Sequence, residues 1–248
     1  METVVIEPHG KIALLRLDNG VTNAISPLLV DELGEAVRKV QAEFHGMVLA
    51  GGSKFFCIGL DLPTLLKLDR TKMGEFWEAF DQVVLDLFSL LLPTAAAMAG
   101  HATAGGTILA LTADYRFGVP GRRLMGLNEV NIGVPVPFLA DLMLRHIISE
   151  RSATDLVYRG ELLAHEHAKA LGLVDEIYPE DELESSALDA VDRMVQRPQP
   201  AFGIIKKNRI QAVCRRFETH RRAKREEMMS CWFLPAVQTL LTQAAEKF

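Results

Sequence analysis

The first third of the chain alternates between short runs of β-forming residues and one run with helical spacing. Residues 4–7 and 12–18 are rich in Val, Ile and Leu and flank a Pro-His-Gly-Lys turn, which predicts a hairpin. Apolar residues then recur at helical spacing over 28–40, and Ser26 followed by a proline is typical of a helix start. The short apolar run 46–50 predicts a buried strand.

The middle of the chain continues this alternation. Residues 72–92 carry an apolar stripe at helical spacing and predict a long amphipathic helix, which the following proline terminates. Strands are expected at 94–99 and 115–119. Between them, a glycine-bearing turn at 100–106 opens an apolar helix at 107–112.

Beyond residue 133 the pattern is mostly helical. The predicted helices cover 138–148, 152–158 with Ser152 as N-cap, 164–171 and 182–196. A short strand is expected at 174–178, and prolines within 197–200 precede long helices over 201–248. Strands alternating with helices predict an α/β fold. We expect a core domain at 1–197 and a helical C-terminal region at 198–248.

Composition narrows the class of protein. The chain has 248 residues, of which 49% are hydrophobic and 24% charged, and this is ordinary globular usage. No apolar run reaches the roughly 18–20 residues of a membrane span, and no secretory signal is visible. Three cysteines, Cys57, Cys214 and Cys231, lack the spacing of a metal site. We therefore expect a cytoplasmic protein with reduced thiols and no membrane partner.

Charge is distributed unevenly. Residues 206–225 hold nine Lys and Arg against one acid, a charge of +8, so the rest of a chain with net charge −5 carries −13. Three interpretations stay open: a solvated helical face or subunit contact, a phosphate-binding patch for a nucleotide-like ligand, and a nucleic-acid contact. We expect no nucleic-acid partner, because the remaining acidic chain would repel the phosphate backbone.

Two glycine turns, at 58–61 and 104–107, each follow an apolar run and open a helix. Glycine permits such tight turns, so either turn alone is ordinary structure. Neither matches a P-loop or a dinucleotide-binding fingerprint. A strand, turn and helix in this order also leave backbone N–H groups free to bind an anion or a developing negative charge. One carboxylate, Glu129, follows among apolar or small neighbours.

Taken together, these segments resemble the crotonase (enoyl-CoA hydratase/isomerase) superfamily. The first signature reads KFFCIGLD at 54–61, and the second is the turn from Gly100 to Gly106. Residues 59–62 (GLDL), 110–116 (ALTADYR) and 126–129 (GLNE) are most similar to Δ3,Δ2-enoyl-CoA isomerases of the mitochondrial type. The resemblance covers nearly the full length.

The resemblance implies a fold, a site and partners. The fold would be a spiral of ββα units, with 198–248 as a trimerisation and CoA-covering region. The backbone N–H groups of Leu60 and Gly105 would polarise the thioester carbonyl, and Glu129 would be the catalytic base. It implies a homotrimer or hexamer, an acyl-CoA substrate of fatty acid β-oxidation, and no metal or redox cofactor beyond coenzyme A in the substrate. The implied substrate-binding residues are Ile58, Gly59, Leu60, Asp61, Leu62, Gly105 and Asn128.

One departure from the family pattern favours isomerisation over hydration. Hydratases of this superfamily use two glutamates to activate water, and Ile108 stands at the first of these positions. One carboxylate suffices to move a proton from C2 of a 3-enoyl-CoA to C4. We expect an apolar lining that includes Ile108, Ile132 and Phe138 to raise the pKa of Glu129 and to exclude water.

Rival interpretations remain for the function and for single residues. The chain would otherwise be a crotonase-type hydratase or hydrolase, a catalytically silent acyl-CoA-binding homologue, or a protein that binds RNA through its basic stretch. We expect His101 to pack in its turn and Cys57 to be a buried thiol rather than a nucleophile. Asp61 is expected to cap the helix that begins at Leu62.

Overall fold

Two mixed β-sheets carry the chain, and the computed structural model describes residues 1–246 of it. The larger sheet has the order β1-β2-β3-β5-β7-β10 and the smaller one β4-β6-β8-β9. The strands are β1 (Val4–His9), β2 (Ile12–Leu17), β3 (Gly46–Ala50), β4 (Phe55–Cys57), β5 (Thr94–Met98), β6 (His101–Thr103), β7 (Tyr115–Gly118), β8 (Leu124–Gly126), β9 (Leu163–Ala164) and β10 (Glu176–Ile177).

The chain passes from the larger sheet to the smaller one in a repeated unit. β3 is followed by β4, β5 by β6 and β7 by β8, and each pair leads into one or more helices. This arrangement is the spiral of ββα units that the resemblance implied, and the expected α/β fold is confirmed. The helices are α1 (Pro27–Glu43), α2 (Leu62–Leu65), α3 (Arg70–Ser89), α4 (Gly105–Leu111), the 3-10 helix η1 (Glu129–Ile132), α5 (Phe138–Ile147), α6 (Glu150–Arg159), α7 (His165–Ala170), α8 (Leu183–Val195), α9 (Gln199–Trp232) and α10 (Pro235–Ala245).

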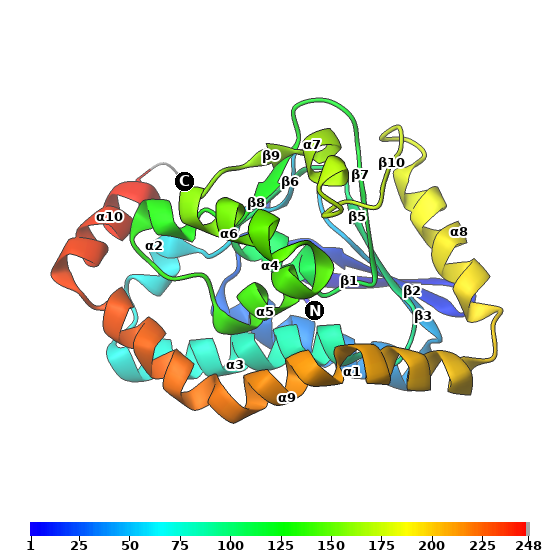
Figure 1. Ribbon diagram of the computed structural model, residues 1–248, viewed down its shortest axis with the longest axis horizontal. Helices are drawn as coiled ribbons and strands as arrows, with labels where there is room; N and C mark the ends of the chain where they lie inside the picture. Colours follow the sequence, from blue (N-terminus) through cyan, green and yellow to red (C-terminus); the bar gives the residue numbers. More distant parts are fainter. Residues whose placement is uncertain (247–248) are drawn as a thin grey trace.

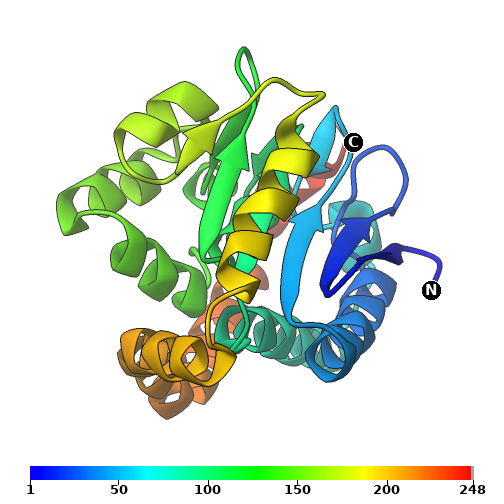
Figure 2. The ribbon, with the colours of Figure 1, turned by 90° about the vertical axis from the view of Figure 1, so that its right-hand side faces the viewer.

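Both faces of the larger sheet are covered. In β3, Met47 and Leu49 pack into the main core, whereas Val48 and Ala50 face the opposite side. That side is covered by α8, which lies across the sheet in Figure 2. A strand buried on both faces loses the apolar–polar alternation of a half-exposed strand. For this reason β3 was predictable only as a short continuous apolar run.

The C-terminal helices run along the rest of the molecule. Figure 1 shows α9 beside α3 along one edge, with α10 next to α2. Side chains of both helices, such as Phe217, Trp232 and Leu241, belong to the same core cluster as α1 and α3. The division at residue 197 therefore stays a prediction. Within residues 1–246, no helix combines the length and the apolarity that crossing a membrane requires.

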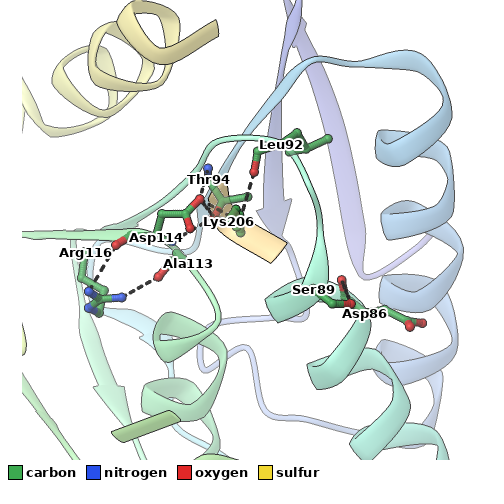
Figure 3. A network of polar contacts seen from close by, with 8 residues as sticks. All are labelled: Asp86, Ser89, Leu92, Thr94, Ala113, Asp114, Arg116 and Lys206. Carbon is green, nitrogen blue, oxygen red and sulfur yellow. Dashed lines mark hydrogen bonds and ion pairs between the residues drawn. The ribbon is translucent and has the colours of Figure 1, made fainter. Parts of the chain in front are cut away.

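A buried ion pair ties α9 to the sheets (Figure 3). The ammonium group of Lys206 lies 2.7 Å from a carboxylate oxygen of Asp114 and donates a hydrogen bond to the carbonyl of Leu92. The same Asp114 carboxylate accepts hydrogen bonds from the backbone N–H and hydroxyl of Thr94. Arg116, two residues further on, donates to the Ala113 carbonyl that follows α4. Charged groups thus join α9, β5 and the end of α4 inside the protein.

Two helix boundaries differ from the predictions. Ser149, not Ser152, caps α6, because its hydroxyl accepts the N–H of Ser152, which is already helical. Helix α3 ends at Ser89 rather than at Leu92. Leu90 leaves the helical conformation with φ −52° and ψ 122°, so that the chain is already extended where a proline follows.

Candidate active site

Three strands of the smaller sheet deliver the candidate residues to one edge. β4 pairs with β6 and β6 with β8, all in parallel, so their carboxyl ends point the same way. Leu60 follows β4, Gly105 follows β6 and Glu129 follows β8. The carboxyl edge of parallel strands is where α/β proteins commonly build their sites. The strand before the second glycine turn is therefore β6, whereas the sequence pattern indicated β5.

The two glycine turns lie directly against each other. A Cβ on Gly105 would be 2.6 Å from Cδ1 of Ile25 and 3.1 Å from Cα of Gly59. A Cβ on Gly106 would collide with the carbonyl oxygen of Cys57. Because no side chain stands between them, the backbones of the two turns approach each other closely. Ala104, at the start of α4, has φ 49° and ψ −116°, a conformation that residues other than glycine rarely adopt.

This close approach leaves two backbone donors on one cavity. Within the part of the chain that the structure describes, the N–H groups of Leu60 and Gly105 have no hydrogen-bond acceptor. Both residues line a cavity of about 560 Å³. Fixed donors of this kind suit an oxygen atom on which negative charge develops, because they need no reorganisation when the charge appears.

The cavity brings together most of the predicted site. Its walls include Ile58, Leu60, Leu62, Gly105, Asn128 and Glu129. Gly59 and Asp61 are not among its lining residues. Gly59 instead supplies the turn with φ 101°, and Asp61 caps α2 by accepting the N–H of Thr64 at 3.1 Å, as predicted.

Glu129 is a buried carboxylate, and no cation among residues 1–246 compensates its charge. Its residue is 6% exposed, and its Oε2 has no hydrogen-bond partner among the described residues. Burial raises the pKa of the Glu129 carboxyl to about 7. Ile108 and Ile132 line the same cavity, as expected, but Phe138 does not. Phe138 faces α9 instead, where its ring centroid is 6.5 Å from that of Phe217.

Two other candidates have structural roles. Cys57 is fully buried, and burial raises the pKa of its thiol to about 12, so no thiolate forms near neutral pH. His101 accepts the backbone N–H of Leu124 through Nδ1 at 3.1 Å and packs against Phe55. Within residues 1–246, no group of three or more His, Cys, Asp and Glu side chains is arranged to hold a metal ion.

Some lining residues were not predicted from the sequence. Trp77 and Phe80 reach the cavity from α3, Ala244 from α10, and Asn131 from η1. In the sequence, the aromatic residues of α3 share the spacing of ordinary core residues. The only sequence feature that could have indicated the cavity is a tryptophan in this helix, and tryptophan occurs in packed cores as well.

The basic stretch is only partly free to bind an anion. Lys206 is buried against Asp114, while Arg221, Lys224 and Arg225 pair with Glu218, Glu227 and Glu78 respectively. These pairs favour the interpretation of 206–225 as a charge-matched helical face. Arg216, Arg221, Lys224 and Arg225 also border a second cavity, of about 490 Å³.

Comparisons with known proteins agree with the fold and the motifs. Residues 7–236 match the family model described as enoyl-CoA hydratase/isomerase. The chain is 28% identical to human mitochondrial enoyl-CoA delta isomerase 1, over 99% of this chain and 83% of that protein. It is 31% identical to enoyl-CoA delta isomerase 3 of Arabidopsis thaliana, over 68% of this chain and 74% of that protein. The crystal structure of human mitochondrial Δ3-Δ2-enoyl-CoA isomerase superposes with a TM-score of 0.95 at 28% identity, covering 99% of this chain and 97% of that one.

Proposed function

Because the chain belongs to the enoyl-CoA hydratase/isomerase family, the crotonase superfamily, we propose that it is a Δ3,Δ2-enoyl-CoA isomerase. Members of this family bind acyl-CoA substrates. The proposed reaction moves the double bond of a 3-enoyl-CoA from C3–C4 to C2–C3, where it is conjugated with the thioester carbonyl.

The proposed mechanism uses one base and two backbone donors. The Glu129 carboxylate takes a proton from C2, and the electron pair of that C–H bond enters a dienolate whose negative charge rests on the thioester oxygen. The N–H groups of Leu60 and Gly105 donate hydrogen bonds to that oxygen. Glu129 then returns the proton to C4, which leaves the double bond between C2 and C3. Removing one such donor typically raises the barrier by about 2.7–4 kcal/mol.

One observation carries the choice of isomerase over hydratase. Glu129 is the one carboxylate among the described residues that line the cavity, and Ile108 lines the same cavity where a hydratase would have a second glutamate. An isoleucine cannot hold or activate water. A carboxyl with a pKa near 7 can both accept a proton and release it at neutral pH, which supports a shuttle by a single residue.

Substituting the base tests this proposal. In the Glu129→Gln variant we expect kcat for conversion of 3-hexenoyl-CoA to the 2-enoyl isomer to fall by roughly 10²–10⁴-fold. Binding of saturated hexanoyl-CoA, measured by calorimetry, should remain, because the amide keeps the shape of the carboxyl. Glu35→Gln, an exposed position on α1, is the matched control and should keep wild-type activity.

The rival functions give different results in the same assays. A wild-type protein that binds hexanoyl-CoA but isomerises nothing would be a silent homologue. Addition of water to 2-hexenoyl-CoA at a rate comparable to isomerisation would refute the argument from Ile108. Release of free CoA thiol would indicate a hydrolase, and RNA retention that weakens steeply with salt would indicate a nucleic-acid function.

A further inference from the structure

The second cavity adjoins the one that contains Glu129. Four residues line both: Trp77, Val134, Pro135 and Pro137. They therefore form the wall between the two spaces. Trp77 has the largest side chain of the four, and it projects from α3, whose neighbour is α9.

Trp77 is held in this wall by packing rather than by polar contacts. It is 3% exposed, and its ring centroid lies 5.9 Å from that of Phe80 and 6.3 Å from that of Trp232, both edge-on. Its indole Nε1 has no hydrogen-bond partner among the described residues. A buried indole N–H usually has an acceptor. Because this one has none among the described residues, packing against neighbouring rings fixes the position of the side chain.

The two cavities differ in what they offer an alkyl chain. Among residues 1–246, Glu129 is the only ionisable side chain on the walls of the first. The second is bordered by acidic and basic side chains, among them Asp81, Asp141 and Arg225. An alkyl tail gains by leaving water for an apolar wall, but it loses where it strips water from charged groups. The first cavity therefore suits an acyl tail better than the second, which still offers apolar contacts such as Val130, Val136 and Met228 to the end of a long chain.

We propose that the Trp77 indole is the partition that limits the length of the acyl chain. This inference rests on the proposed isomerase function. A short acyl chain ends against the indole, within the cavity that holds Glu129. A long chain must displace the indole to reach the second cavity. Trp77 is thus a specificity-determining residue that acts on chain length and takes no part in proton transfer.

The test measures kcat/KM for 3-hexenoyl-CoA and for 3-hexadecenoyl-CoA. We expect wild type to prefer the shorter thioester. Trp77→Leu should raise the ratio of long-chain to short-chain kcat/KM at least about ten-fold, because it opens the wall between the cavities. Trp77→Phe, which keeps an aromatic ring in the core, should raise the ratio less. Retained activity on 3-hexenoyl-CoA shows that a variant is folded.

Tyr158→Ala is the matched control, since Tyr158 lines the second cavity but not the first and is 77% exposed. It should leave the ratio at its wild-type value. Equal use of both thioesters by wild type would overturn the proposal, as would an unchanged ratio in both Trp77 variants.

A binding measurement separates this proposal from the proposed function. The dissociation constants of hexanoyl-CoA and palmitoyl-CoA do not depend on any reaction. If their ratio changes in the Trp77 variants while no protein isomerises 3-enoyl-CoA, the partition stands and the isomerase proposal fails. If isomerisation is present and neither ratio changes, the partition alone is refuted.

Discussion

At the scale of single residues, Glu129 links catalysis to stability. Its carboxyl is buried in a mostly apolar cavity with no cation from the described residues, and its pKa is raised from 4.5 to about 7. Between these two values the folded protein holds a proton that the unfolded chain has released. The free energy of unfolding therefore falls as pH rises through this window, and the full penalty is present above about pH 7.

The Glu129→Gln variant should remove the loss of stability that the buried charge causes. We expect it to be more stable than wild type by up to about 3 kcal/mol near pH 8, and by less near pH 5, where the buried carboxyl of folded wild type is protonated and uncharged. Urea unfolding at the two pH values measures the difference. In wild type, kcat/KM should rise with pH through about 7, as Glu129 loses its proton. A pH-independent difference in stability would contradict this assignment.

Ala104 is a second residue under constraint. It holds a positive φ of 49° beside Gly105, where its own Cβ is strained. Ala104→Gly should therefore raise the free energy of unfolding by about 1 kcal/mol, and thermal unfolding would show it as a higher Tm. Ala104→Val should have the opposite effect, because a branched side chain tolerates this conformation least. If glycine destabilised the protein, strain at Ala104 would not be significant.

The same residues show what a sequence can and cannot reveal about a site. Leu60, Gly105 and Glu129 were found because glycine turns and a lone carboxylate leave local motifs. Trp77 and Ala244 were missed because a residue that lines a cavity has the same helical spacing as one that fills a core. Phe138 was misplaced for a related reason, since its spacing does not tell which neighbouring helix it faces.

At the scale of elements, the attachment of α9 depends on one buried cation. Lys206 is 5% exposed, and burial lowers the pKa of its ammonium group. The sequence placed it in a basic stretch with eight other cations, yet it also stands at helical spacing to Ile210, Val213 and Phe217, which are all buried. That spacing was the available signal of its burial. Composition alone could not separate it from its exposed neighbours.

Removing this cation should loosen α9. Lys206→Met leaves the partly buried Asp114 carboxylate without its positive partner, and we expect a loss of about 1–3 kcal/mol in the free energy of unfolding. Lys207→Met, one position along the helix and exposed, should change it by less than about 0.5 kcal/mol. Urea unfolding of both variants makes the comparison. If both variants lost the same free energy of unfolding, the ion pair between Lys206 and Asp114 would not contribute to stability.

Short strands were the elements least accessible from sequence. β6 and β8 have three residues each, too few for an alternating pattern to emerge: β6 was read as part of the turn at 100–106, and no element was predicted at β8. The strand β3 and the start of α1 at its Ser26 cap were predicted correctly, although α1 continues to Glu43, beyond the predicted 40. Longer elements are easier to predict because more of their side chains lie on a buried face and form a recognisable pattern.

At the scale of the whole molecule, the spiral explains why the site is compact although its parts are distant in sequence. Each ββα unit adds one strand to the smaller sheet, and each of three successive units contributes one part of the site at the same edge. Resemblance to a family revealed this architecture; periodicity alone indicated only an α/β protein. The trimer, the cytoplasmic location and the CoA-covering role of 198–248 stay predictions.

The position of α10 has a consequence for the order of events during synthesis. Val237 and Leu240 pack beside Gly133, the residue that ends η1, and Ala244 helps to line the cavity. The two glycine turns and Glu129 are translated long before these residues. Until α10 docks, the part of the cavity wall that Ala244 supplies is missing, and we expect solvent to enter the space that Glu129 also lines. We therefore expect a nascent chain to complete its site only after its last described helix is in place.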